Sequence, residues 1–145
     1  MIRKAILLAC ALAGAGLAHA RQTQDIDPDL LAYIEGIEED TGTKRFGRVM
    51  LGELEGADAA TISVPVDPSS WTFIAVICGP SCEQINGTAY SASGKEIAKA
   101  PMSGSDAVIQ VPPGNGATVA VKVDMLVCEW DTCPYAVQTF TRTGS

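Results

Sequence analysis

Apolar and polar side chains alternate along most of the chain after residue 45, which is the pattern of half-buried β-strands. The clearest case lies between residues 118 and 128, where Lys122 and Asp124 face away from a predicted buried row. That row consists of Val119, Val121, Val123, Met125 and Val127. A nearly unbroken apolar run at residues 71–78 predicts a central strand buried on both faces, with Trp71 in the core.

Weaker strands are predicted around these two, at residues 46–54, 61–66, 85–91, 95–98, 106–111 and 135–141. Turn-forming residues separate several of them, most clearly at residues 67–70 and 112–116, which are rich in proline, glycine, serine and asparagine. About eight short strands with turns between them predict a mainly β fold, an antiparallel sandwich or barrel.

One helix is predicted before the strands. Asp27 is placed to cap its N-terminus, Pro28 would occupy its first position, and Gly42 can end it. Its apolar residues recur at helical spacing, at Leu30, Leu31, Ile34 and Ile37. The acidic run at residues 38–40 lies at the negative end of the helix dipole, so we expect the helix to depend on packing against the sheet.

The first 20 residues have the layout of a secretory signal peptide. Arg3 and Lys4 precede an apolar run, and the small-residue motif Ala-His-Ala at residues 18–20 predicts cleavage after Ala20. The run of about 14 residues is shorter than the roughly 20 that a membrane-spanning helix needs. A lipoprotein would use Cys10, but the apolar run continues well past it.

Removing these 20 of the 145 residues leaves 125, with 8 basic against 17 acidic side chains, a net charge of −9 and no histidine. Nucleic-acid binding needs clustered Lys and Arg, so the charge excludes that class of partner. No later segment is apolar enough to insert into a membrane, and we expect a periplasmic or secreted protein. The predicted organisation is a signal peptide at 1–20, a helical segment at 21–44 and a β-sandwich at 45–145.

Four cysteines follow the signal peptide, and an even number in an exported chain predicts disulfide bonds. Cys78 lies near Cys82, and Cys128 lies near Cys133, so three pairings are possible. Proximity favours the local pairing, whereas crossed bridges would each stabilise by roughly 4 kcal/mol against about 2 kcal/mol for local ones. Neither spacing is the C-x-x-C of redox or zinc-binding pairs, which argues against both chemistries.

The segments WTFIAVICGPSC (71–82) and VAVKVDMLVCEWDTCPYAV (119–137) resemble the bacterial pre-peptidase C-terminal-like domains and their stand-alone secreted relatives. The cysteine pairs at strand ends, and Tyr135 after the second pair, carry this resemblance. It implies a jelly-roll-like β-sandwich, the local pairing of cysteines, and an accessory role rather than a reaction.

A calcium-stabilised module is one alternative, since relatives often carry several aspartates at the first cysteine turn. Here Gly79, Gln84 and Asn86 stand near those places and only Glu83 keeps a charge, whereas calcium prefers several carboxylate oxygens. We therefore predict no metal and no cofactor. The Asn-Gly-Thr sequon at residues 86–88 is interpreted as a turn.

Catalysis has little support, because without histidine the usual nucleophilic triads cannot form. The alternative is a secreted hydrolase that uses surface carboxylates, with Glu53 and Glu55 or Glu129 and Asp131 as candidates.

Trp130, between Glu129 and Asp131, either anchors a partner or folds back over the end of a sheet. The sequence thus favours an exported, non-catalytic β-sandwich module that binds a protein or a carbohydrate or has a structural role.

Overall fold

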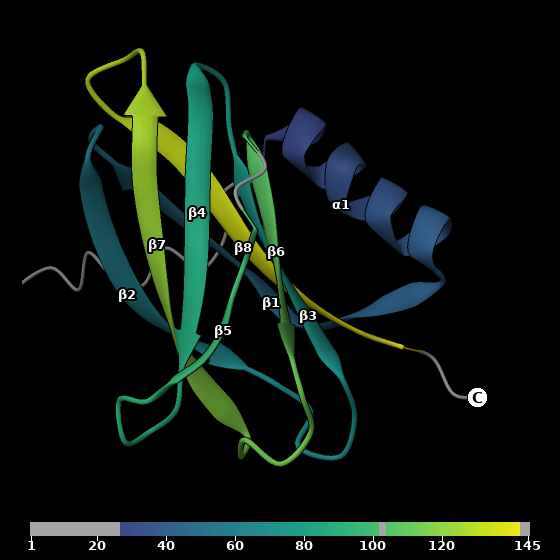
Figure 1. Ribbon diagram of the computed structural model, residues 1–145. Coiled ribbons are helices and arrows are strands. Elements are labelled where there is room, and N and C mark those ends of the chain that lie inside the picture. The colour runs from purple at the N-terminus through teal and green to yellow at the C-terminus, as the bar shows by residue number, and fades with distance from the viewer. Residues whose placement is uncertain (1–26, 102–103, 143–145) are drawn as a thin grey trace, which may run out of the picture.

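The computed structural model describes residues 27–101 and 104–142, and it shows a two-layer β-sandwich with one helix on the outside (Figure 1). The elements are α1 (Pro28–Thr41), β1 (Thr43–Leu54), β2 (Asp58–Pro65), β3 (Thr72–Cys78), β4 (Cys82–Tyr90), β5 (Glu96–Lys99), β6 (Asp106–Val111), β7 (Thr118–Cys128) and β8 (Cys133–Arg142). The predicted mainly β fold with an N-terminal helix is confirmed.

The two sheets have the strand orders β1-β8-β3-β6 and β2-β7-β4-β5, and every neighbouring pair is antiparallel. Sequence neighbours therefore lie in opposite sheets at most steps, which is the jelly-roll arrangement. We call the first the helix-side sheet, because α1 packs on its outer face, and the second the far sheet (Figure 1).

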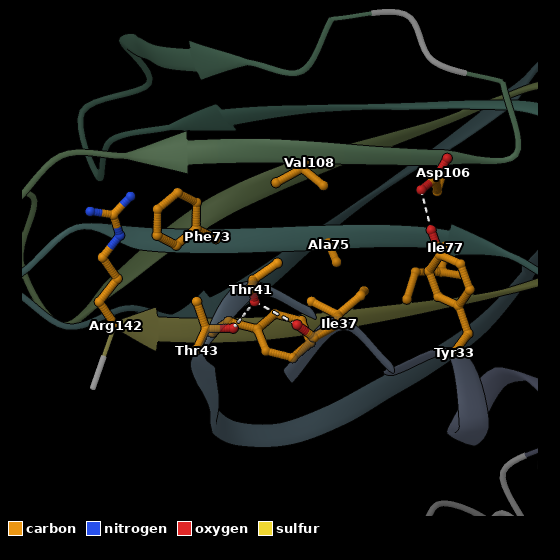
Figure 2. A pocket seen from close by; sticks show the side chains of 11 residues that line it. Tyr33, Ile37, Thr41, Thr43, Phe73, Ala75, Ile77, Asp106, Val108 and Arg142 are labelled. Atoms are coloured by element: carbon orange, nitrogen blue, oxygen red, sulfur yellow. Dashed lines mark hydrogen bonds between the residues drawn. The ribbon is translucent and has the colours of Figure 1, made fainter. Parts of the chain in front are cut away.

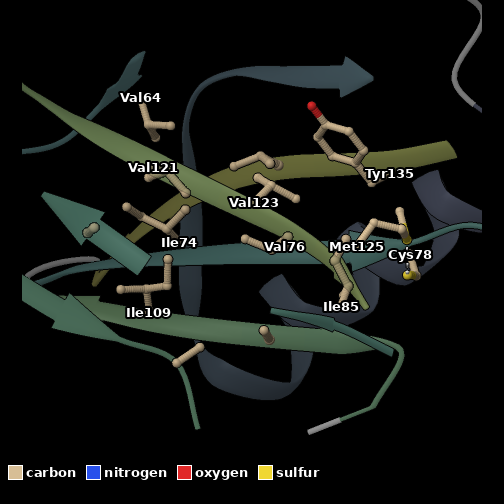
Figure 3. Packing of buried hydrophobic residues seen from close by; sticks show 14 of the residues in the cluster. Val64, Ile74, Val76, Cys78, Ile85, Ile109, Val121, Val123, Met125 and Tyr135 are labelled. Carbon is tan, nitrogen blue, oxygen red and sulfur yellow. Dashed lines mark hydrogen bonds between the residues drawn. The ribbon is translucent and has the colours of Figure 1, made fainter. Parts of the chain in front are cut away.

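The core lies between the two sheets (Figure 3). Its almost fully buried side chains include Val64, Ile74, Val76, Ile85, Ile109, Val121, Val123 and Met125. β3 is buried on both faces, as its apolar sequence predicts. Ile74 and Val76 belong to the core between the sheets, while Ala75 and Ile77 pack in the cluster beneath α1. The same strand thus builds the core and the surface on which the helix lies.

Two core predictions are wrong. Trp71 precedes β3 and is 50% exposed, because the strand begins only at Thr72. Val127 is 38% exposed, although Val119 to Met125 alternate into the core as expected. The register between β7 and β4 shifts on both sides of Gln84, which pairs with Val127, so the simple alternation does not extend to this residue.

The cysteines form the two local pairs that the family resemblance implies. The Cα atoms of Cys78 and Cys82 lie 5.6 Å apart, and those of Cys128 and Cys133 lie 5.8 Å apart. The crossed pairing, which loop entropy favours, is not formed, because the turns after β3 and β7 bring each cysteine to its near neighbour. Cys82 lies opposite Cys128 in the far sheet, so both bridges hold the same end of the sandwich. They are compatible with an oxidising compartment.

α1 begins and ends where the sequence predicts. The Asp27 carboxylate accepts a hydrogen bond from the N–H of Asp29 at 2.8 Å, and Gly42 ends the helix in a left-handed conformation. Ile34 is buried against the helix-side sheet. The acidic C-terminal turn gains a partner that the sequence does not suggest, since Glu38 forms an ion pair with Arg45 at 3.2 Å.

The predicted signal peptide and its cleavage site at Ala20 lie outside the described residues. Within the described ranges, no helix is long and apolar enough to cross a membrane. The sequon at residues 86–88 is not a turn but part of β4, and both Asn86 and Thr88 are buried.

Candidate functional site

The outer face of the helix-side sheet is only partly covered. α1 packs against β1, β8 and the Ala75 and Ile77 side chains of β3, and β6 is the edge strand beside β3 (Figure 1). Val108, in the middle of β6, is 42% exposed although it lies beside the cluster beneath α1. Folding therefore leaves a strip of apolar sheet surface uncovered next to the helix.

A groove of about 280 Å³ follows this strip, close to the lower limit of ordinary small-molecule sites (Figure 2). β3 supplies Phe73, Ala75 and Ile77 to its floor, because odd-numbered residues of this strand point to the outer face. Val108 of β6 and Ile37 of α1 lie along it. The lining between the two ends is thus mainly apolar and comes from elements far apart in the sequence.

One end of the groove is formed by Tyr33 of α1 and Asp106 of β6. The Tyr33 hydroxyl donates a hydrogen bond to the Asp106 carboxylate. Partial burial, followed by this hydrogen bond and the negative charge of Asp106, raises the pKa of Tyr33 to about 12. The phenol therefore keeps its proton at neutral pH and remains a donor. Beyond this pair lies a second hollow of about 200 Å³, whose lining includes Asp27 and Asp29.

The other end carries a positive charge. The Arg142 guanidinium carbon lies 5.7 Å from the centre of the Phe73 ring, within range of a cation–π contact. Nearby, the hydroxyls of Thr41 and Thr43 are hydrogen-bonded to each other at 2.7 Å. The ion pairs in the described part of the chain are Arg45–Glu38 and Lys122–Asp124, and neither involves Arg142. The groove is therefore apolar along its length, acidic at one end and basic at the other.

The predicted partner-binding residues lie elsewhere, in the loop of the Cys128–Cys133 bridge. Trp130 is 58% exposed, so it is not packed over a sheet end as a core residue would be. Glu129 and Asp131 beside it are also exposed. The N–H of Glu129 donates to the carbonyl of Ser81 at 2.8 Å, which joins this loop to the other cysteine loop.

The carboxyl of Glu129 lies close to the carboxyl of Glu83, the second residue of β4. The shared hydrogen bond, together with the negative charge of Glu129, raises the pKa of Glu83. An acid whose pKa is higher in the folded state binds protons more readily there than in the unfolded chain. Stability from this pair is therefore greatest at low pH and falls as pH rises from the unfolded Glu pKa through the raised folded value.

We expect Glu129→Gln to raise the melting temperature slightly at neutral pH, by about 1 °C, because it removes this repulsion at an exposed site. The gain should shrink in acid, at pH values below the raised pKa of Glu83, where the Glu83 carboxyl is protonated and the repulsion is absent. Thermal unfolding at the two pH values measures it, with Glu96→Gln on β5 as the control for loss of one exposed negative charge. Equal effects of the two substitutions at neutral pH would contradict the pairing.

The remaining candidate acids do not gather into a site. Glu53 lines a shallow hollow that also includes Asp27, and Glu55 follows β1 in an exposed turn. Among the described residues, no three His, Cys, Asp or Glu side chains lie close enough together to hold a metal ion. The carboxylate that raises the pKa of Glu83 is that of Glu129.

Sequence reasoning did not find the groove. Its end residues Tyr33, Asp106 and Arg142 carry no motif, and only the tertiary fold brings them to one surface. The sequence of β6 contains one weak sign of apolar surface outside the core. Val108 is apolar, but it lies on the face opposite to the buried Ala107 and Ile109. Comparison with protein-family models and with curated proteins finds no match to the chain.

Proposed function

We propose that the protein is an exported, non-catalytic β-sandwich module that holds the apolar part of a small ligand in the groove beside α1. The observation that carries the proposal is the apolar surface that Phe73 and Val108 leave uncovered beside α1, between two polar ends. Small-molecule sites typically combine an apolar concave surface with a few polar groups that orient the ligand. The groove has this composition.

Export and the lack of catalysis rest on separate support. The sequence has a signal-peptide layout, and the two local cysteine pairs suit an oxidising compartment. The segment after residue 20 has no histidine, and the hydroxyl that the groove pairs with a carboxylate, that of Tyr33, has its pKa raised to about 12, which opposes its use as a nucleophile. We also propose, on the cysteine pattern and the jelly-roll order of strands, that the chain is a relative of the pre-peptidase C-terminal-like domains.

Trp130 supports a second candidate function, the binding of a protein or a carbohydrate at the cysteine end. The exposed Leu126 and Val127 lie four and three positions before it, so apolar surface accumulates around this loop. Such exposed aromatic and aliphatic groups suit a partner surface.

The groove is tested with N-phenyl-1-naphthylamine, a neutral apolar probe whose fluorescence rises on leaving water. We expect saturable binding to one site. Val108→Asp should weaken it at least tenfold, because the apolar probe would have to bury a new carboxylate.

The matched control is Leu126→Asp, which adds the same charge at a similarly exposed apolar residue of β7 outside the groove. It should change the probe affinity by less than about twofold. Absence of saturable binding, or equal losses in the two variants, would refute the proposal.

A further inference from the structure

We infer that the ligand of the groove is the monocarboxylate of a medium-length hydrocarbon chain, bound with its carboxylate at Arg142 and its tail toward Tyr33. This inference rests on the proposed function, because it names the class of ligand for the same groove. It depends on the charges at the two ends and on the distance between them.

The charges fix the direction of the ligand. Arg142 has its guanidinium against the Phe73 ring and forms no ion pair within the described ranges, so its N–H groups can donate hydrogen bonds to an anion. A planar guanidinium binds a carboxylate through two parallel hydrogen bonds. The opposite end holds Asp106, with Asp27 and Asp29 in the hollow beyond it, and would repel an anion.

Two of the carboxylates at the acidic end accept hydrogen bonds from the protein. Asp106 accepts the hydrogen bond of the Tyr33 hydroxyl, and Asp27 accepts the N–H of Asp29 as the cap of α1. These hydrogen bonds stabilise the two carboxylates, whereas the Arg142 guanidinium has no anionic partner in the described part of the chain. For this reason the geometry favours an anionic over a cationic ligand.

The length of the floor limits the tail. Phe73 and Ile77 are four residues apart along β3, which corresponds to about 13 Å at the rise of an extended strand. With C–C bonds of about 1.5 Å, a zigzag chain of roughly ten carbons spans this floor. Ala75, between them, leaves room because its side chain is a single methyl group.

The test compares three probes with straight ten-carbon chains by calorimetric titration at neutral pH: decanoate, decanol and decyltrimethylammonium. We expect decanoate to bind about tenfold more tightly than decanol. Hydrogen bonds between the Arg142 guanidinium and a carboxylate are stronger than those to a neutral hydroxyl, because both partners are charged. Arg142→Gln should abolish this preference for decanoate over decanol. Arg142→Lys should keep part of it.

Arg48→Gln is the control, since it removes the same charge from an exposed position on β1 that does not line the groove. Equal affinities for decanoate and decanol, a preference that survives Arg142→Gln, or tighter binding of the cationic probe would each overturn the inference and leave the groove itself intact. Failure of all three probes to bind would overturn the proposed function as well.

Discussion

Replacing Ile74 with alanine is expected to lower the free energy of unfolding by about 2–5 kcal/mol. Ile74 is fully buried between the sheets in β3, which has β8 on one side and β6 on the other (Figure 3). Hydrogen bonding to both neighbours prevents β3 from moving to fill the space that the missing atoms leave. The cost therefore includes lost burial and an unfilled cavity.

Urea unfolding followed by circular dichroism measures this change. Leu126→Ala is the control, because Leu126 is partly exposed on β7 and its truncation should cost less than about 1 kcal/mol. Since a protein of this size is stable by about 5–15 kcal/mol, Ile74→Ala removes a large part of the margin. Similar losses for the two variants would mean that β3 is not the centre of the core.

Gly52→Ala is expected to lower the free energy of unfolding by about 1–3 kcal/mol, the usual cost of overpacking. Gly52 lies opposite Tyr135 in the pairing of β1 with β8. A β-carbon at residue 52 would come within 2.5 Å of the ring and hydroxyl of Tyr135, closer than real contacts allow. Tyr135 is buried, so the ring cannot simply turn away into water.

Gly36→Ala is the matched control and should have the opposite sign. Gly36 lies inside α1, and a β-carbon there would meet no atom within 4 Å. Alanine should stabilise this helix by about 0.5–1 kcal/mol. In a Tyr135→Leu background, which removes the clashing atoms, Gly52→Ala should cost clearly less. Urea unfolding of the four variants tests the contact, and an unchanged cost in that background would rule it out.

The sequence predicts local features whose cause is local. The cap at Asp27, the proline after it and the glycine at residue 42 mark α1 because each satisfies a requirement of the helix backbone. The apolar run of β3 and the alternation of β7 up to Met125 likewise reflect burial. These features were sufficient to predict a mainly β fold, an antiparallel sandwich or barrel, while the family resemblance implied the sandwich.

Features that depend on the neighbouring strand were not predictable. Val127 continues the alternation in the sequence, but the shifted register of β4 leaves it exposed. Trp71 looks like the start of the buried run, yet β3 begins one residue later. The groove is a more extreme case, because Phe73 and Val108 come to line one surface only when the sheet and α1 are assembled. No pattern along the chain contains this information.

The most direct test of the groove is a titration of nitrogen-15-labelled protein with decanoate, followed by amide chemical shifts. We expect saturable shifts that concentrate on Phe73, Ala75, Ile77 and Val108, with little change at Trp130. Saturable shifts centred on the loop of Trp130, or no saturable shifts at all, would contradict it.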